Sequence, residues 1–313
     1  KERGCTVNYT KILDKKEIEN YDYIILTSSI ICHETELKAL QELNNQGKKV
    51  FVIGIFANVM KEKYKTKNSY IVNGEAESFF NKIKLDREEI EKFFLDEEHV
   101  QYTSNQVDNL DDLPFPDWEY YSKKYPLKNN FLGFNSKVAI PITATRGCPY
   151  SCFNYCTYPL QQGRKVRFRT AKNVVKEIKH WVGKLKTNKF IFRDPVFSIN
   201  RKYTVDLCKE IINENLKIEY LIETHLKNLD DELIALLKKS GLKLVYVGIE
   251  SAVADVLKDI NRFTVDQDNQ YQVIKKLVDN DIYVKSMFMF GNPEDDERTI
   301  KQTIDYSLKL PHQ

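Results

Sequence analysis

The chain of 313 residues is 30% charged and 42% hydrophobic, the mixture of a soluble globular protein with room for two ordinary domains. Its net charge of +3, from 48 basic and 45 acidic residues, does not favour nucleic-acid binding. No stretch approaches the roughly 20 apolar residues of a membrane span, so we expect neither a span nor a signal peptide.

Residues 1–107 alternate strand and helix signals. Strands are predicted at Thr6–Leu13, Tyr23–Thr27, Lys49–Ile53 and Tyr70–Val72, with helices at Glu34–Asn45 and just after Gly74. The short apolar runs are typical of buried parallel strands. We therefore predict an open α/β domain whose first strand and helix lie outside this sequence.

Residues 108–135 break this alternation. The segment Leu113–Trp118 carries two prolines around an aromatic residue, which predicts an extended linker.

Residues 136–313 contain five strand–helix units. Strands are predicted at Val138–Thr145, Lys189–Arg193, Ile218–Glu223, Leu244–Ile249 and Tyr283–Phe290. Helices are predicted at Ala171–Leu185, Arg201–Glu214, Asp230–Lys239, Val265–Asn280 and Asp296–Leu308. This order predicts part of a (β/α) barrel, which carries its chemistry at the carboxyl ends of its strands. We expect a sixth strand beyond this sequence.

Three of the six cysteines, Cys148, Cys152 and Cys156, fall within one loop. Six are too few for a disulfide scaffold, so this grouping predicts a metal site in a reducing compartment, and hence a cytoplasmic protein. Three thiolates in one loop can hold three corners of a [4Fe–4S] cluster and leave one iron open. A zinc-stabilised binding module is the non-enzyme alternative, although zinc favours paired Cys-x-x-Cys groups and a fourth ligand.

The segment 146–160 resembles the cluster loop of the radical S-adenosylmethionine (SAM) superfamily. That family usually shows Cys-x3-Cys-x2-Cys with an aromatic residue before the last cysteine, whereas this chain has Cys-x3-Cys-x3-Cys with Tyr155 in that place. Further segments resemble cobalamin-dependent members of the superfamily: 113–118, 159–169, 173–178, 192–197, 248–251 and 290–293.

The resemblance implies an enzyme that reductively cleaves SAM to a 5′-deoxyadenosyl radical and then removes hydrogen from an unactivated carbon. It implies a [4Fe–4S] cluster, SAM and cobalamin as cofactors. It also implies a small-molecule substrate and an electron donor such as flavodoxin or ferredoxin. C-methylation is the leading reaction. A methylthiotransferase with two clusters is the alternative, since residues 2–8 resemble the start of such enzymes.

Several strand-end residues are candidates for binding SAM. Asp194 is expected to accept from the SAM ammonium, or else to cap the next helix. Glu250 and Ser251 are placed to hold the ribose hydroxyls. Glu223 and His225 face the same end of the barrel if side chains alternate along their strand. Two further candidates lie near adenine: Tyr155, through ring contact, and Gly291, through close backbone approach.

A basic run of Arg164, Lys165, Arg167 and Arg169 follows the cysteines. It suits an anionic substrate, but a solvated charged face is the plainer interpretation.

In the first domain, the carboxyl edge of the sheet is where a ligand of an open α/β fold binds. This edge carries Ser28, Ser29, Gly54, Gly74 and Glu75, small or polar residues that suit a nucleotide tail and a corrin edge. The family's Asp-x-His-x-x-Gly loop is not in this sequence, so a structural buttress without cobalamin is the alternative.

Overall fold

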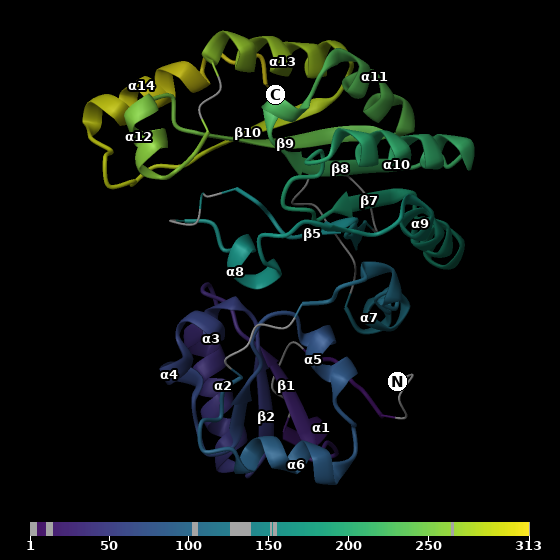
Figure 1. The fold of residues 1–313 in the computed structure, drawn as a ribbon, viewed down its shortest axis with the longest axis vertical. Coiled ribbons are helices and arrows are strands. Elements are labelled where there is room, and N and C mark those ends of the chain that lie inside the picture. The colour runs from purple at the N-terminus through teal and green to yellow at the C-terminus, as the bar shows by residue number, and fades with distance from the viewer. Residues whose placement is uncertain are drawn as a thin grey trace. The chain divides into compact units, whose positions relative to one another are not determined.

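The computed structural model describes residues 5–10, 15–101, 106–125, 139–150, 152, 155–263 and 266–312. The chain divides into two compact units (Figure 1). The first comprises Lys1–Asp108 and Thr157–Gly163, and the second comprises Asn109–Cys156 and Arg164–Gln313.

The first unit is built on a three-stranded parallel sheet. Its strands are β1 (Tyr23–Thr27), β2 (Lys49–Ile53) and β3 (Ser69–Ile71), in the order β1-β2-β3. Its helices are α1 (Lys15–Ile18), α2 (His33–Asn45), α3 (Ile55–Val59), α4 (Lys61–Tyr64), α5 (Ala76–Lys82), α6 (Arg87–Leu95) and α8 (Tyr158–Gln162). Val50 and Val52 pack on one side of the sheet and Phe51 on the other, as the alternation of a strand requires.

The strand predicted at Thr6–Leu13 is wrong for residues 6–10, which form no strand, and residues 11–13 lie outside the described residues. Val7 and Tyr9 are 49% and 45% exposed, so no neighbouring strand buries them. The predictions at Tyr23–Thr27 and Lys49–Ile53 are confirmed, with the same bounds.

The proline-containing segment is extended only in part. A short 3-10 helix, Leu110–Asp112, precedes it, and α7 (Trp118–Lys124) follows directly. The Asp117 carboxylate accepts from the Tyr120 amide at 3.0 Å, which starts α7 where an extended linker was predicted. Phe115 and Trp118 pack against the core of the second unit.

The second unit contains a five-stranded sheet whose neighbours are all parallel. Its strands are β4 (Ile140–Ile142), β7 (Lys189–Phe192), β8 (Glu219–Thr224), β9 (Leu242–Glu250) and β10 (Tyr283–Phe288), in the order β10-β9-β8-β7-β4. Each strand therefore lies beside its predecessor in the chain, which confirms the predicted (β/α) order as an open sheet of described strands.

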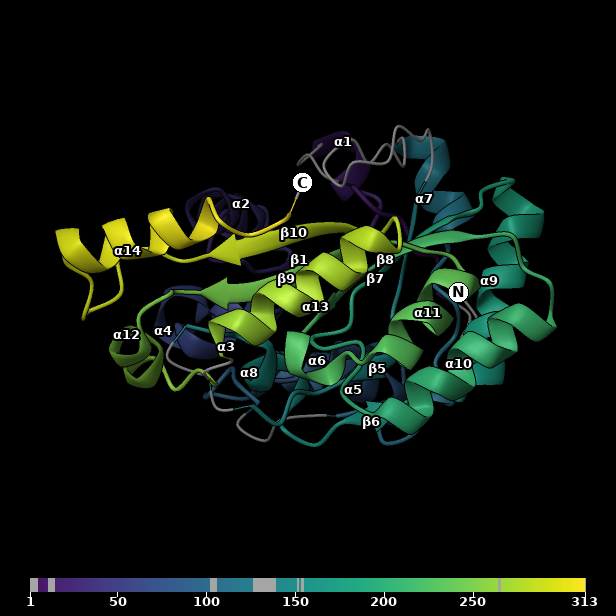
Figure 2. The same cartoon turned by 90° about the horizontal axis from the view of Figure 1, so that it is seen from above.

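Helices follow the strands of this sheet. They are α9 (Ala171–Leu185), α10 (Arg201–Asn213), α11 (Asp231–Ser240), α12 (Ala254–Asp259), α13 (Gln267–Asp279) and α14 (Glu297–Ser307). Figures 1 and 2 show α11 and α13 along one side of the sheet. Five of these helices begin at a side chain that accepts from a backbone amide three residues on: Thr170, Asn200, Asp230, Asp266 and Asp296.

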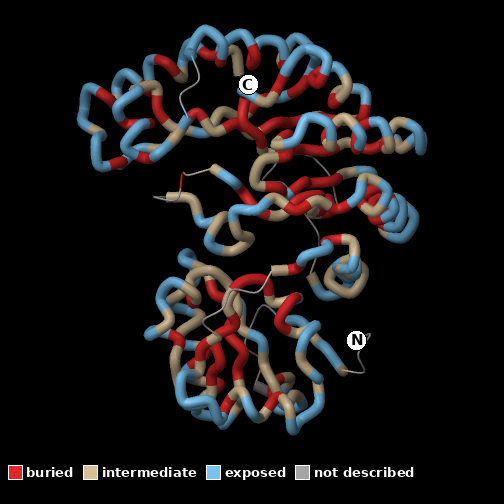
Figure 3. Tube along the Cα trace, in the orientation of Figure 1, coloured by how far each residue is buried: buried red, intermediate tan, exposed pale blue. Residues whose placement is uncertain are grey.

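The two faces of this sheet have different roles. Phe190, Phe192 and Tyr220 belong to the large core that includes the helices, whereas Ile191 and Leu221 form a small cluster on the opposite face. The strands β7, β8 and β9 are mostly buried, as Figure 3 shows, whereas the edge strand β10 is partly exposed. By alternation, Arg193 and Glu223 continue the face of Ile191 and Leu221, so polar side chains follow that face at the strand ends.

Candidate active site

A short antiparallel ribbon closes the base of the cysteine loop. β5 (Thr145–Arg146) pairs with β6 (Arg167–Phe168), so that Arg146 lies opposite Arg167. Gly147 has φ +98°, and a Cβ there would lie 2.2 Å from the Lys165 carbonyl oxygen. Glycine is therefore required where the loop starts, because the two chain segments approach closely.

Cys148 and Cys152 are buried, and Cys156 is half-buried. The Cys156 amide donates to the Cys152 carbonyl at 2.9 Å, so one turn separates these two thiols. Burial raises the pKa of the Cys148 thiol, and the nearby Cys156 and Cys152 raise it further. Among the described residues, no three histidine, cysteine or acidic side chains already meet in a metal-binding arrangement. The ligand assignment stays a prediction.

Asp194 lies at the base of this loop and is fully buried. Its carboxylate accepts from the backbone amides of Ala144, at 3.1 Å, and of Thr145. Burial raises its pKa to about 6, although those hydrogen bonds oppose the shift. The alternative of a helix cap is wrong, because Asn200 caps the helix that follows. The carboxylate instead ties the end of β7 to the start of the cysteine loop.

Two of the four residues in the basic run, Arg167 and Arg169, are buried within the fold. Arg169 is buried, forms an ion pair of 2.5 Å with the buried Glu177 and donates to the Thr143 carbonyl at 2.9 Å. Arg167 is also buried, whereas Arg164 and Lys165 are exposed. A solvated face is therefore wrong for Arg167 and Arg169, because both residues are buried.

Glu250 ends β9 in the left-handed region, with φ +67°. Its carboxylate accepts from the Tyr155 hydroxyl at 3.5 Å and lies 3.7 Å from the guanidinium of Arg262. Burial raises the pKa of Glu250, with Arg262 and the Tyr155 hydrogen bond opposing it. Burial first, and then the Glu250 charge, raises the pKa of Tyr155. Two predicted candidates from distant parts of the chain thus meet.

Arg262 was not predicted from the sequence. It follows α12, donates to the Gly248 carbonyl at 2.9 Å and points a second nitrogen at the Cys152 sulfur, 3.9 Å away. Its neighbours in the sequence carry no metal or catalytic motif, so only the chain path brings it to the cysteine loop.

Ser251 and Gly291 lie in tight turns. The Ser251 hydroxyl lies 3.2 Å from that of Thr303 and accepts from the Val253 amide at 3.1 Å. Gly291 has φ +89° with open space where a Cβ would stand, and its amide donates to Asp295 at 2.9 Å. The described contacts of Ser251 are therefore internal, whereas Gly291 has open space beside it.

The end of β8 carries two further candidates. Glu223 forms an ion pair of 3.0 Å with Arg193, and burial raises its pKa. His225 is buried, accepts from the Lys227 amide at 3.3 Å and caps the 3-10 helix Leu226–Asn228. Burial and the charges of Arg262 and Lys227 lower its pKa to about 4. His225 is accordingly neutral near pH 7.

The loop residue Tyr150 lies beside this strand end. Its ring is 5.3 Å from that of Phe263, and the Lys227 ammonium lies 4.6 Å from the Tyr150 ring and 3.7 Å from the Phe263 ring. Through these cation–π contacts, Lys227 beyond β8 joins Tyr150 of the cysteine loop to Phe263 beyond α12.

In the first unit, Ser28 and Gly54 lie against each other after β1 and β2. The Ser28 hydroxyl donates to the Ile53 carbonyl and accepts from the Ala57 amide, each at 2.9 Å. A Cβ on Gly54 would lie 2.5 Å from the Ser28 carbonyl oxygen. Both residues thus shape the turn itself.

The remaining candidates of this edge have internal partners too. The Ser29 hydroxyl donates to Glu36 at 2.8 Å. Gly74 has φ +84°, and the buried Glu75 accepts from the Val107 amide at 2.7 Å. By contrast, Ile30 and Ile31, which follow Ser29 in the loop after β1, are 69% and 90% exposed.

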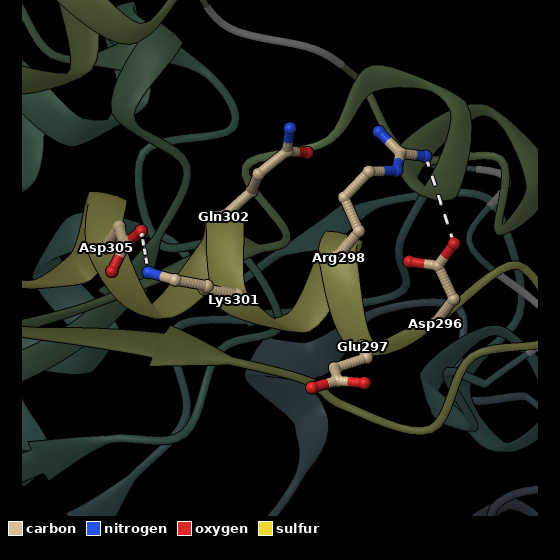
Figure 4. A pocket seen from close by; sticks show the side chains of 6 residues that line it. All are labelled: Asp296, Glu297, Arg298, Lys301, Gln302 and Asp305. Atoms are coloured by element: carbon tan, nitrogen blue, oxygen red, sulfur yellow. Dashed lines mark hydrogen bonds and ion pairs between the residues drawn. The ribbon is translucent and has the colours of Figure 1, made fainter.

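A hollow of about 540 Å³ lies beside α14, lined by Asp296, Glu297, Arg298, Lys301, Gln302 and Asp305 (Figure 4). Lys301 pairs with Asp305 at 2.7 Å, and Arg298 lies 4.0 Å from Asp296. None of the predicted site residues lines this hollow, whose three acidic and two basic side chains leave one negative charge in excess.

A family model described as the radical SAM superfamily matches residues 142–307, a range that holds all three loop cysteines. The chain belongs to the radical SAM superfamily. This membership confirms the predicted family and enzyme class, and the alternative of a non-enzymatic zinc module is wrong.

Three similar proteins extend this result. The bacteriochlorophyllide d C-12(1)-methyltransferase of Chlorobaculum tepidum is 24% identical over 94% of this chain and 62% of its own length. The structure of the radical SAM methyltransferase TsrM from Kitasatospora setae, with tryptophan and a SAM analogue bound, has a TM-score of 0.70 at 14% identity. It covers 95% of this chain and 62% of that one.

The third is the cobalamin-dependent SAM radical enzyme OxsB, solved with aqua-cobalamin and SAM. Its TM-score is 0.71 at 16% identity, covering 93% of this chain and 44% of that one. At these identities, the two solved structures show the fold alone. This radical SAM chain spans less than two thirds of each of the three proteins. In the described residues, no helix is long and apolar enough to cross a membrane.

Proposed function

We propose that this chain holds a [4Fe–4S] cluster through Cys148, Cys152 and Cys156 and belongs to an enzyme that methylates carbon in a small molecule. The observation that best supports this proposal is the cysteine loop. The β5–β6 ribbon closes this loop at its base, and the loop lies within the residues that match the radical SAM family model. The chemistry of the donor set supports a cluster, because thiolate sulfur is the ligand that iron–sulfur clusters take and three cysteines lie in this one loop.

When bound, such a cluster supplies one electron for the reductive cleavage of SAM. The residues of this chain have the tasks of holding and orienting. Asp194 fixes the amides at the base of the loop. Tyr155 and Glu250 offer a hydrogen-bonded pair that we assign, together with Glu223, Ser251 and Gly291, to the SAM site. An electron donor such as flavodoxin or ferredoxin would supply the electron.

Anaerobic reconstitution tests the cluster. We expect about four irons and four sulfides per chain, lost on replacing Cys148, Cys152 or Cys156 by Ala and kept in the matched variants C32A and C208A. About eight irons would favour the two-cluster methylthiotransferase. A requirement for Cys208 in place of a loop cysteine would overturn the ligand assignment.

We further propose that residues 1–107 bind cobalamin, residues 108–135 link the domains and residues 136–313 form the radical SAM barrel. Relatives support the cobalamin assignment, because OxsB carries that cofactor. Exposed Ile30 and Ile31 at the carboxyl edge supply an apolar surface for a corrin. The hydroxyl groups of Ser28 and Ser29 already have hydrogen-bond partners. We therefore assign the contacts with cobalamin to the backbone of this edge and to the two isoleucines.

Hydroxocobalamin titration with gel filtration tests this assignment. I31S should weaken binding by roughly 10- to 150-fold, since burying an isoleucine contributes roughly 1.5–3 kcal/mol, while stability stays unchanged. L95S is the matched control: Leu95 is 79% exposed and ends α6 in the same unit. Absence of a co-eluting corrin from a chain with an intact cluster would leave a radical SAM enzyme without a cobalamin step.

A further inference from the structure

Arg262 brings a buried positive charge to the cysteine loop. Its side chain is 12% exposed, and one guanidinium nitrogen lies 3.9 Å from the Cys152 sulfur. The other terminal nitrogen donates to the Gly248 carbonyl at 2.9 Å and faces Glu250 at 3.7 Å. An arginine guanidinium is not deprotonated in proteins. The guanidinium is therefore charged and fixed at three points.

The surrounding backbone is built to admit this side chain. A Cβ on Gly248 would lie 2.8 Å from an Arg262 nitrogen and 2.4 Å from a Glu250 carboxylate oxygen. Glu250 itself adopts φ +67°, a conformation that costs a non-glycine residue free energy. Strain of this kind persists where the surrounding structure imposes it, and it gathers at functional sites.

We propose that Arg262 is a positioning residue that holds Cys152 and stabilises the one-electron-reduced form of the cluster through its charge. This inference rests on the proposed function, because it requires a cluster on the loop. Reduction adds one negative charge to the cluster, and a low-potential one-electron donor supplies that electron. A fixed cation beside a ligand sulfur lowers the free energy of the reduced form more than that of the oxidised form.

Glu250 places a negative charge beside the positive charge of Arg262. Its carboxylate is 14% exposed and lies next to Arg262, so its negative charge disfavours the added electron. Removing each charge should therefore move the reduction equilibrium in opposite directions. A loosened loop would not produce that pair of opposite shifts, which separates the electrostatic role from a merely structural one.

The test is potentiometric titration of the reconstituted, SAM-free chain with dithionite, followed by EPR of the reduced cluster. For R262Q we expect the ratio of reduced to oxidised cluster at a fixed potential to fall about tenfold, or ~59 mV for one electron. R262K keeps the charge and should stay within about threefold of wild type. E250Q should raise the ratio.

R201Q is the matched control, because Arg201 is half-exposed and pairs with Asp230 and Glu232 at the surface. It should titrate as wild type. An R262Q cluster at the wild-type potential overturns the proposal. If iron analysis shows that R262Q holds no cluster, the E250Q variant provides the test. A raised ratio of reduced to oxidised cluster in E250Q then supports the proposal, and an unchanged or lowered ratio overturns it. A wild-type chain without a cluster overturns the proposed function as well.

Discussion

The carboxylate of Asp194, just beyond β7, accepts a hydrogen bond of 3.1 Å from the backbone amide of Ala144, just beyond β4. This bond joins the ends of two neighbouring parallel strands directly before the cysteine loop. Asp194 is fully buried, so its protonation state matters for the stability of the loop base.

The first prediction concerns the pH dependence of this carboxyl group. Burial raises the Asp194 pKa to about 6 in the folded protein, against about 3.9 in an unfolded chain. The folded state holds this proton more tightly, so the stabilisation is full below about pH 4 and is lost as the pH rises through about 6. Relative to D194N, the free energy of unfolding of wild type should fall by on the order of 2 kcal/mol.

Urea unfolding of the apoprotein at several values between pH 4 and pH 7.5 provides the measurement. Subtracting the D194N curve removes the contributions of other titrating groups. Parallel curves for wild type and D194N across this range would show that the Asp194 pKa is not raised.

The second prediction concerns the buried ion pair of Arg169 and Glu177. Glu177 is 1% exposed, so E177Q would leave the Arg169 charge buried without its partner. We expect a loss of about 3–5 kcal/mol of unfolding free energy. The matched control is E214Q, because Glu214 forms an exposed pair with Lys179 at 2.7 Å. That change should cost about 0–1 kcal/mol, and equal losses would contradict this account.

The third prediction compares two glycines. G248A would place a Cβ against Glu250 and Arg262, and such overpacking is expected to cost about 1–3 kcal/mol. Gly183 lies in α9, and a Cβ added there would meet no other atom within 4 Å, so G183A should stabilise the chain by roughly 0.5–1 kcal/mol. Thermal unfolding of both variants checks the pair, and a neutral G248A would mean that Glu250 and Arg262 move aside freely.

The elements whose signals are local could be predicted from the amino-acid sequence. The helix Ala171–Leu185 has the predicted bounds because its apolar face and its Thr170 cap lie within one short stretch. The order of five strand–helix units followed for the same reason. Likewise, the prediction of a metal-binding loop needs only the three cysteines within nine residues and no knowledge of the fold.

The contacts of several polar side chains could not be predicted, because they depend on how the chain folds in three dimensions. Arg262 reaches Cys152 across 110 residues of sequence, and no local pattern distinguishes it from the other arginines. Asp194 was predicted at a strand end, yet its amide partners depend on the parallel pairing of β7 with β4. Propensity and periodicity act between near neighbours, whereas these contacts exist only once the sheet has aligned distant strand ends.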